Sequence, residues 1–290
     1  MSTLYSRYIV LGARLFRGKE LSIMTFAFAL ASLCFVLKWE YQGWGTYTYL
    51  TLMVLWLTNV FLLSGAFVSN DYHDIKFDYI NKPEKVIIGN ELSRRKAILT
   101  QWGLTLVGLL LSMAISWKAL IFFMFFSIVL WSYTVYFKRT FIWGNIVAGL
   151  LGAGFMLQFS LVFDLKAMPL YIYSMFAFIF VMLKDLIKDL VNYYGEKAGG
   201  VDSMPVRLGI RRSKQVIMYV LVFFVLLWSI FLIYYFQGFY LAIAFILMLP
   251  ILLFVKVLRN ADTRTKFRRV AFWFDLLTVY GMVSMFFLKI

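Results

Sequence analysis

Apolar residues occur along this chain in long runs of about twenty residues, separated by short polar stretches that hold most of the charged residues. An α-helix needs roughly 20 residues to cross the hydrocarbon core of a bilayer. The pattern therefore predicts an all-α, polytopic membrane protein with nine transmembrane helices, near 21–38, 46–69, 97–116, 118–137, 141–163, 169–187, 214–236, 238–258 and 270–289. The division between the third and fourth helices rests on Lys118 alone.

The composition supports an integral membrane protein. Hydrophobic residues make up 63% of the 290 residues and charged residues only 15%, far from the composition of soluble proteins. We expect residues 1–290 to form a single transmembrane domain with a short cytoplasmic lead over residues 1–20. No small-residue cleavage site precedes Leu21, so the first helix is expected to be retained. The single cysteine, Cys34, excludes an intrachain disulfide and is expected to be a small buried apolar side chain.

The basic residues predict the orientation in the membrane, because Lys and Arg gather in cytoplasmic loops. With nine helices, all but four of the 29 basic residues fall on the side of the N-terminus, and the exceptions are Lys38, Lys118, Lys166 and Lys289. The N-terminus is therefore expected in the cytoplasm and the C-terminus on the opposite side of a plasma or inner membrane. The net charge of +15 fits loops beside anionic lipid headgroups, so we expect membrane lipids and no nucleic acid as partners.

A first cluster of polar residues ends the second predicted helix and consists of Asn70, Asp71, Asp74 and Asp78. The three aspartates, at spacings of three and four residues, share one helical face, and Asn70 lies one turn before Asp74. Neighbouring carboxylates repel one another unless a cation lies between them. Their oxygens suit Mg²⁺, particularly where substrate phosphates complete its coordination.

A second cluster ends the sixth predicted helix and again shares one helical face, with the residues Asp185, Asp189, Asn192 and Glu196. Both clusters follow even-numbered helices, so both are expected at the cytoplasmic side of the membrane. Two solvated helix ends are the alternative interpretation. Two oxygen-rich faces on the same side, each with an asparagine, favour a site for Mg²⁺ and a diphosphate.

Three motifs occur here in the same order as in a known family. The first is Asn70-Asp71-Tyr72-His73-Asp74-Ile75-Lys76-Phe77-Asp78, of the form NDxxDxxxD, continued by Asn81-Lys82-Pro83. The second comprises Asp185, Lys188-Asp189, Gly195, Gly200 and Ser203-Met204-Pro205. The third lies between these two along the chain and comprises Tyr133, Lys138-Arg139 and Gly144-Asn145. On these motifs the chain resembles the UbiA superfamily of intramembrane prenyltransferases. It departs from the second motif at Asn192 and Glu196, where the family usually has Asp, which leaves the number of metal ions open.

The resemblance implies helices around a central cavity and Mg²⁺-dependent transfer of a prenyl group from an isoprenoid diphosphate to a lipophilic acceptor. It implies Asn70, Asp74, Asp185 and Asp189 as principal metal ligands, with Asp74 and Asp189 essential for catalysis. The further ligands, or residues that orient the ligands, would be Asp71, Asp78, Asn192 and Glu196. Lys138 and Arg139 would bind the leaving diphosphate and act in catalysis, with weaker candidates for binding in Tyr133, Lys82 and Lys188. A basic pair beside a membrane span is also a common topology signal.

The acceptor is less specified than the donor. The residues after the first motif, Asn81-Lys82-Pro83-Glu84-Lys85, differ from the RTxxRP-like continuation of aromatic-acid prenyltransferases. The chain resembles instead the digeranylgeranylglyceryl phosphate synthases, which implies geranylgeranyl diphosphate as donor and geranylgeranylglyceryl phosphate as acceptor. An aromatic acceptor, such as 4-hydroxybenzoate or homogentisate, is the alternative. A cation transporter is a remote alternative, because its acidic residues would follow a path across the bilayer rather than gather in two clusters.

Two other ionisable residues need an interpretation. His73, the only histidine, occupies a variable position of the first motif and is expected to face away from the aspartates. It is therefore not assigned as a catalytic base. Asp275 lies inside the last apolar run, where a carboxylate is a functional candidate by default, although it can instead pair with a basic residue.

Overall fold

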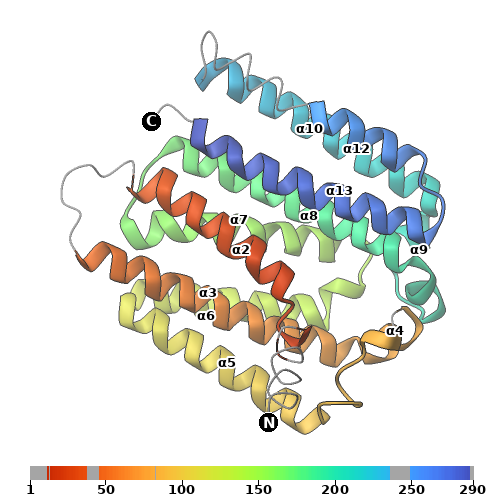
Figure 1. Ribbon diagram of the computed structural model, residues 1–290, viewed down its shortest axis with the longest axis horizontal. Coiled ribbons are helices and arrows are strands. Elements are labelled where there is room, and N and C mark those ends of the chain that lie inside the picture. The colour runs from red at the N-terminus through yellow and green to blue at the C-terminus, as the bar shows by residue number, and fades with distance from the viewer. Residues whose placement is uncertain (1–11, 13, 38–45, 82, 236–248, 288–290) are drawn as a thin grey trace, which may run out of the picture. The chain divides into compact units, whose positions relative to one another are not determined.

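The computed structural model describes residues 12, 14–37, 46–81, 83–235 and 249–287, and within these residues the regular structure is helical (Figure 1). The helices are α2 (Gly18–Ala31), the π-helix η1 (Ser32–Leu37), α3 (Thr46–His73), α4 (Ile75–Asn81), the 3₁₀ turn η2 (Pro83–Lys85), α5 (Arg94–Ile115), α6 (Trp117–Val135), the 3₁₀ turn η3 (Phe137–Arg139), α7 (Trp143–Phe163), α8 (Met168–Ala198), α9 (Met204–Leu208), α10 (Ile210–Tyr235), α12 (Leu249–Arg259), α13 (Arg264–Val283) and the 3₁₀ turn η4 (Ser284–Phe287). The all-α membrane fold predicted from the sequence is confirmed.

Eight helical segments in the described residues are long and apolar enough to cross a membrane: Gly18–Leu37, Tyr47–His73, Arg94–Ile115, Trp117–Arg139, Trp143–Phe163, Met168–Ala198, Ile210–Tyr234 and Arg264–Phe286. They correspond to eight of the nine predicted helices. The remaining predicted helix, the eighth in chain order at 238–258, falls partly on residues 236–248, which lie outside the described part of the chain. Only its last portion is described, as α12. The count of nine therefore stays a prediction.

The break between α5 and α6 lies at Ser116, within one residue of the division predicted between 97–116 and 118–137. Ser116 has an extended backbone, and its Oγ accepts a hydrogen bond of 3.1 Å from the backbone N–H of Ala119. A serine in this position caps the first turn of a helix. The break is thus made by the cap, and Lys118 lies inside the first turn of α6.

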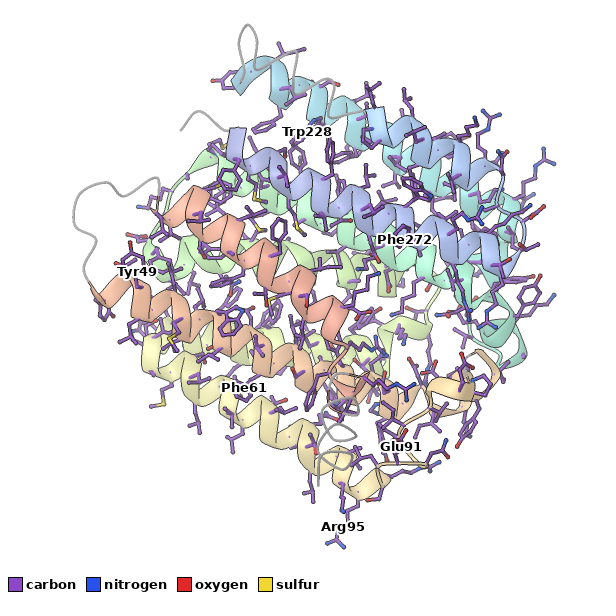
Figure 2. All side chains as sticks on the ribbon, in the orientation of Figure 1. Tyr49, Phe61, Glu91, Arg95, Trp228 and Phe272 are labelled. Carbon is purple, nitrogen blue, oxygen red and sulfur yellow. The ribbon has the colours of Figure 1, made fainter. Side chains whose placement is uncertain are left out.

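Large apolar side chains are exposed along the helices, as expected where lipid is the solvent. Tyr49 and Phe272, for example, are more than half exposed, whereas Trp228 is buried (Figure 2). The polar residues Glu91 and Arg95 lie where the chain enters α5, beyond the apolar run (Figure 2). The side-chain distribution fits helices whose outer surfaces contact acyl chains.

The chain divides into two compact units, which are described separately. The first comprises Met1–Ala29 and Gln42–Val135, and the second comprises Leu30–Tyr41 and Tyr136–Ile290. In the first unit α3 packs against α5 and α6 (Figure 1). A Cβ at Gly108 would lie only 2.7 Å from the Leu62 side chain, so glycine at this position permits the close approach of α3 and α5. The prediction of a single domain over residues 1–290 stays a prediction.

The second unit is built around α8, with α7, α10 and α13 packed against it (Figure 1). Gly149 and Gly152 of α7 face α8, where added Cβ atoms would lie 2.9 Å from the Phe178 ring and 2.6 Å from the Val181 side chain. Glycine at these two positions therefore permits the close packing of α7 and α8. The unit therefore fixes α7 closely against the helix that carries the second acidic cluster.

Asp275 of α13 contacts Lys184 of α8, with 2.9 Å between its Oδ1 and the lysine Nζ. The carboxylate is only 16% exposed, whereas the lysine side chain is 42% exposed. The structure therefore favours the pairing interpretation of Asp275 over a direct role in chemistry. The pair ties α13 to α8 one residue before Asp185.

Removing one charge of this pair should destabilise the protein more than removing both. Asp275→Ala deletes the carboxylate that Lys184 contacts, at an expected cost on the order of 2 kcal/mol, less than the roughly 3–5 kcal/mol of a fully buried pair because Lys184 is partly exposed. Thermal melting in detergent of Asp275→Ala, Lys184→Met and the double variant Lys184→Met/Asp275→Leu measures this. The double variant should melt above both single variants, and additive losses would contradict an ion pair.

Candidate functional site

The second acidic cluster lies on one continuous helix. The sequence placed the end of the sixth span near residue 187, but α8 continues to Ala198, so all four polar residues belong to it. It continues because Leu186, Ile187 and Leu190 are almost fully buried and anchor its apolar side. On the other side Asp185 and Asp189 are 8% and 9% exposed. Asn192 and Glu196, one and two turns further on, are half-buried.

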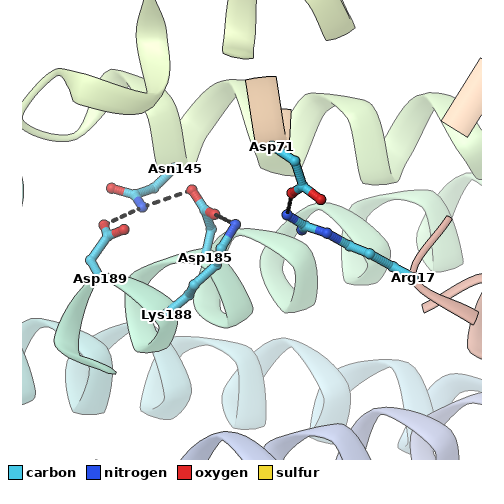
Figure 3. A network of polar contacts seen from close by, with 6 residues as sticks. All are labelled: Arg17, Asp71, Asn145, Asp185, Lys188 and Asp189. Atoms are coloured by element: carbon cyan, nitrogen blue, oxygen red, sulfur yellow. Dashed lines mark hydrogen bonds and ion pairs between the residues drawn. The ribbon is translucent and has the colours of Figure 1, made fainter. Parts of the chain in front are cut away.

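Asn145 joins the two buried carboxylates. Its Nδ2 donates hydrogen bonds to Asp185 Oδ2 at 3.1 Å and to Asp189 Oδ2 at 2.9 Å (Figure 3). Asn145 is the third residue of α7 and is 3% exposed. The preceding Gly144 lets α7 begin close to η3, since a Cβ there would lie 2.5 Å from the Phe137 carbonyl oxygen. The third sequence motif is thus packed against the second, and one amide group holds two acidic oxygens together.

Basic residues accompany this carboxylate pair. Lys188 Nζ lies 3.9 Å from Asp185 Oδ1 (Figure 3), and the charges of Lys188 and Lys138 both act on Glu196. Lys138 and Arg139 are half-buried on η3, the short turn that leads into α7. The second unit therefore brings together acidic and basic residues that the sequence analysis assigned to metal and diphosphate, respectively.

The chain after α8 folds back onto its acidic end. Ser203 Oγ donates a hydrogen bond of 2.6 Å to Glu196 Oε2, and the backbone N–H of Val201 donates to the Glu196 carbonyl at 2.9 Å. Gly200, with a φ of 69°, supplies the left-handed conformation that this turn requires. Ser203 is 2% exposed, so its hydroxyl is a fixed partner of Glu196.

The first acidic cluster lies where α3 passes into α4, in the first unit. The backbone N–H of Asp74 donates to the Asn70 carbonyl at 2.9 Å and that of Asp78 to the Asp74 carbonyl at 2.8 Å, which carries the helical pattern through the junction. Asn70 and Asp74 are 6% and 8% exposed, whereas Asp78 is half-buried. Asn70, Asp74 and Asp78 thus stay on the shared face predicted from their spacing.

Asp71 is paired with Arg17, whose guanidinium donates to its carboxylate (Figure 3). The guanidinium also lies over the Phe67 ring, 5.4 Å from its centroid. Burial lowers the pKa of Arg17, but the charge and hydrogen bond of Asp71, together with the charges of Glu20 and Asp74, outweigh burial and raise the pKa above its ordinary value. Arg17 therefore stays charged. No sequence motif includes Arg17. In the sequence Arg17 is only one of the basic residues before a membrane span, which did not indicate a role in the site.

His73 makes a hydrogen bond within its own helix, and its orientation away from the aspartates stays a prediction. Its Nδ1 is 2.8 Å from the Ser69 carbonyl oxygen, one turn earlier in the same helix, and its ring meets that of Tyr72 edge to face. This bond uses a ring nitrogen within α3. It gives no support to a catalytic base.

The acidic residues do not form a metal centre alone. In the described residues no three His, Cys, Asp or Glu side chains gather closely enough to hold a metal ion. Mg²⁺, however, is usually bound by one or two carboxylates, with waters and substrate phosphates completing its octahedron. The buried pair Asp185 and Asp189 fits that donor set. Whether the two acidic clusters form one site stays a prediction, because they belong to different compact units.

Two further residues predicted to bind the diphosphate, Tyr133 and Lys82, stay predictions. Tyr133 is half-buried on α6, in the first unit. Lys82 lies outside the described residues. Neither prediction is tested.

Comparison with known proteins identifies relatives over most of the chain. Residues 26–276 match the model of the UbiA prenyltransferase family. The digeranylgeranylglyceryl phosphate synthase of Korarchaeum cryptofilum is 30% identical over 199 residues, which cover 68% of this chain and 70% of that protein. The synthase of the same name from Saccharolobus solfataricus is 27% identical over 157 residues, covering 53% of this chain and 56% of that protein. The latter match therefore spans little more than half of the relative.

Solved structures share the fold. A structure of a digeranylgeranylglyceryl phosphate synthase has a TM-score of 0.71 at 20% identity, covering 96% of both chains. A UbiA homologue from Archaeoglobus fulgidus, bound to DMAPP and Mg²⁺, has a TM-score of 0.67 at 16% identity, covering 94% of this chain and 98% of that one. At these identities the likeness concerns the helical architecture alone.

Proposed function

The chain is an intramembrane prenyltransferase that belongs to the UbiA prenyltransferase family, and on that premise we propose that it transfers a geranylgeranyl group from geranylgeranyl diphosphate to geranylgeranylglyceryl phosphate. The observation that carries the proposal is the buried pair Asp185 and Asp189 joined by Asn145, with Lys188 beside it. Such a site suits a substrate group that is itself highly charged and arrives with divalent metal.

The reaction begins with cleavage of the allylic C–O bond, whose electron pair leaves with the diphosphate. A hydroxyl oxygen of the acceptor then forms the new bond to the allylic carbon, and its proton passes to solvent. Mg²⁺, when bound, supplies positive charge against the diphosphate oxygens and so favours this departure. Asp185 and Asp189, with Asn70 and Asp74 from the first cluster, would hold the metal.

The remaining polar residues would orient these groups and bind the diphosphate. Asp71 is engaged by Arg17, so we assign it to holding that guanidinium in place rather than to the metal. Asp78, Asn192 and Glu196 would support the ligands. Lys138 and Arg139 would donate to the departing diphosphate, with contributions from Lys188, Tyr133 and Lys82.

The lipid acceptor is supported by the names of the similar proteins and by the residues that follow the first motif. The test is a competition assay with purified protein, geranylgeranyl diphosphate, Mg²⁺ and equal amounts of geranylgeranylglyceryl phosphate and 4-hydroxybenzoate or homogentisate. Mass spectrometry identifies the product. We expect the digeranylgeranyl lipid to dominate. A prenylated aromatic as the main product would establish the alternative acceptor class.

We propose further that the N-terminus and the acidic clusters lie on the cytoplasmic side, as the distribution of basic residues predicts. In a Cys34→Ala background, a cysteine introduced at the exposed Glu84 should react with a membrane-impermeant maleimide only in inside-out vesicles. Labelling in right-side-out vesicles would reverse the orientation.

Loss of the Ser203 hydroxyl should weaken the site through Glu196. Ser203→Ala removes the donor to Glu196 Oε2, and we expect the Mg²⁺ concentration for half-maximal rate to rise about 10-fold, as for other supports of metal ligands. Ser203→Thr keeps the hydroxyl and serves as the matched control. A Mg²⁺ dependence unchanged by Ser203→Ala would remove Glu196 from the metal's surroundings.

A further inference from the structure

A small hollow lies between α3, α5 and α6, within the first unit. About 20 Å³ of it is open to the centre of a water molecule. A buried water requires on the order of 10–15 Å³ measured in this way, together with two to four polar partners. The hollow thus has room for one ordered water.

Each of the three helices contributes a polar side chain to the wall of the hollow, although the helices lie in a membrane. Ser69 comes from α3, Gln101 and Thr105 from α5, and Ser127 from α6. The hydroxyls of Thr105 and Ser127 donate within their own helices, to the Gln101 carbonyl at 3.0 Å and the Phe123 carbonyl at 2.7 Å. Their oxygen lone pairs therefore remain available to accept a hydrogen bond from a molecule in the hollow.

The hydroxyl of Ser69 lacks a hydrogen-bond partner among the described residues, although Ser69 is only 2% exposed. Leaving a buried hydroxyl unpaired costs free energy, and this is more so in a membrane, where bulk water does not reach the group. Other serines and threonines of these helices, such as Thr58 and Ser112, donate to a carbonyl of their own helix instead. Ser69 is thus distinguished from these neighbours, and it is one of the residues that line the hollow.

We propose that this hollow is a binding site for one structural water molecule. A water accepts a hydrogen bond from the Ser69 hydroxyl and donates hydrogen bonds to the side-chain oxygens of Thr105 and Ser127. It thereby gives the Ser69 hydroxyl a partner and links α3, α5 and α6. The helices α3 and α5 approach each other closely at the wall of the hollow: a Cβ at Gly65 would lie 3.0 Å from Thr105 Oγ1.

The position of the water gives it a structural role behind the first acidic cluster. Each residue advances about 100° around a helix, so Asn70 and Asp74 lie about 100° and 140° from Ser69. The water therefore joins a different side of α3 to α5 and α6, one residue before Asn70, which the proposed function assigns to the metal. The site itself does not depend on that function, because its tests measure folding and density rather than activity.

The sign of the stability change in Ser69→Ala tests the proposal. With a bound water, the substitution deletes one of the water's hydrogen bonds, and the melting temperature should fall by roughly 2–4 °C. With an unpaired hydroxyl, the same substitution removes a cost, and the melting temperature should stay or rise. Ser112→Ala is the matched control, a buried serine of α5 that donates to the Leu109 carbonyl of its own helix at 2.7 Å and does not line the hollow.

A density map that resolves ordered waters gives the second readout. We expect an isolated peak within hydrogen-bond distance of Ser69 Oγ and of the Thr105 or Ser127 oxygen in the wild type. Three results would each overturn the proposal: no such peak, a peak continuous with a lipid or detergent chain, or a melting temperature of Ser69→Ala at or above that of the wild type.

Discussion

Asp189→Asn is expected to lower the rate of prenyl transfer at least about 10³-fold, which corresponds to about 4 kcal/mol of transition-state stabilisation. Asp189 is 9% exposed and shares the Asn145 amide with Asp185, so its charge is part of a buried acidic pair. Asparagine keeps the shape and removes the charge. The rate is measured by mass spectrometry of the product at saturating substrate.

Folding is not expected to suffer in this variant, because two neighbouring buried carboxylates repel each other and one of them is neutralised. The melting temperature and the yield of inserted protein should therefore match the wild type. Asp262→Asn is the control, since Asp262 is 68% exposed and pairs with Lys266 at 2.7 Å. A rate for Asp189→Asn within tenfold of the wild type would remove Asp189 from the chemistry.

Asn145→Leu has the second largest expected effect, a loss of about 10²-fold, the upper range for residues that orient metal ligands. The substitution removes both hydrogen bonds, at 3.1 Å and 2.9 Å, and leaves Asp185 and Asp189 free to move apart. Raising the Mg²⁺ concentration should recover part of the rate, because the carboxylates themselves remain. Titrations of the rate with Mg²⁺ measure both effects.

Gln158→Leu is the control for this prediction. Gln158 is also a buried amide of α7, but its Nε2 donates to the Phe155 carbonyl of the same helix at 2.7 Å. We expect it to retain most of the activity. If Gln158→Leu lost as much as Asn145→Leu, the loss would reflect packing of α7 rather than the carboxylate pair.

The helices were predictable from the sequence because a membrane span needs a run of apolar residues, whatever its neighbours are. Their ends were less so. The apolar run of the sixth span stops near residue 187, but α8 continues to Ala198, because its buried side remains apolar after its other side has become acidic. The mean hydropathy of consecutive residues combines the two sides, so the acidic side hides the apolar side on which the helix continues. The division near Lys118 was predicted to within one residue, but not the cap at Ser116 that makes it.

The candidate site was predictable in its acidic faces, since spacing along one helix fixes which residues share a side. Contacts between helices were not. Asn145 lies 40 and 44 residues before its partners, and Arg17 lies 54 residues before Asp71. Asn145 and Ser203 stood in recognised motifs, but no spacing indicated what they touch. Arg17 stood in none.

Diphosphate release from geranylgeranyl diphosphate, measured against Mg²⁺ concentration for the wild type, Asp74→Ala and Asp189→Ala, tests the central claim most directly. The wild type should release diphosphate only with Mg²⁺ present and the lipid acceptor supplied. Both variants, folded and inserted in the membrane, should show almost none. Undiminished release in both variants, or release that persists after chelation of the metal, would contradict a metal-diphosphate site built on these aspartates.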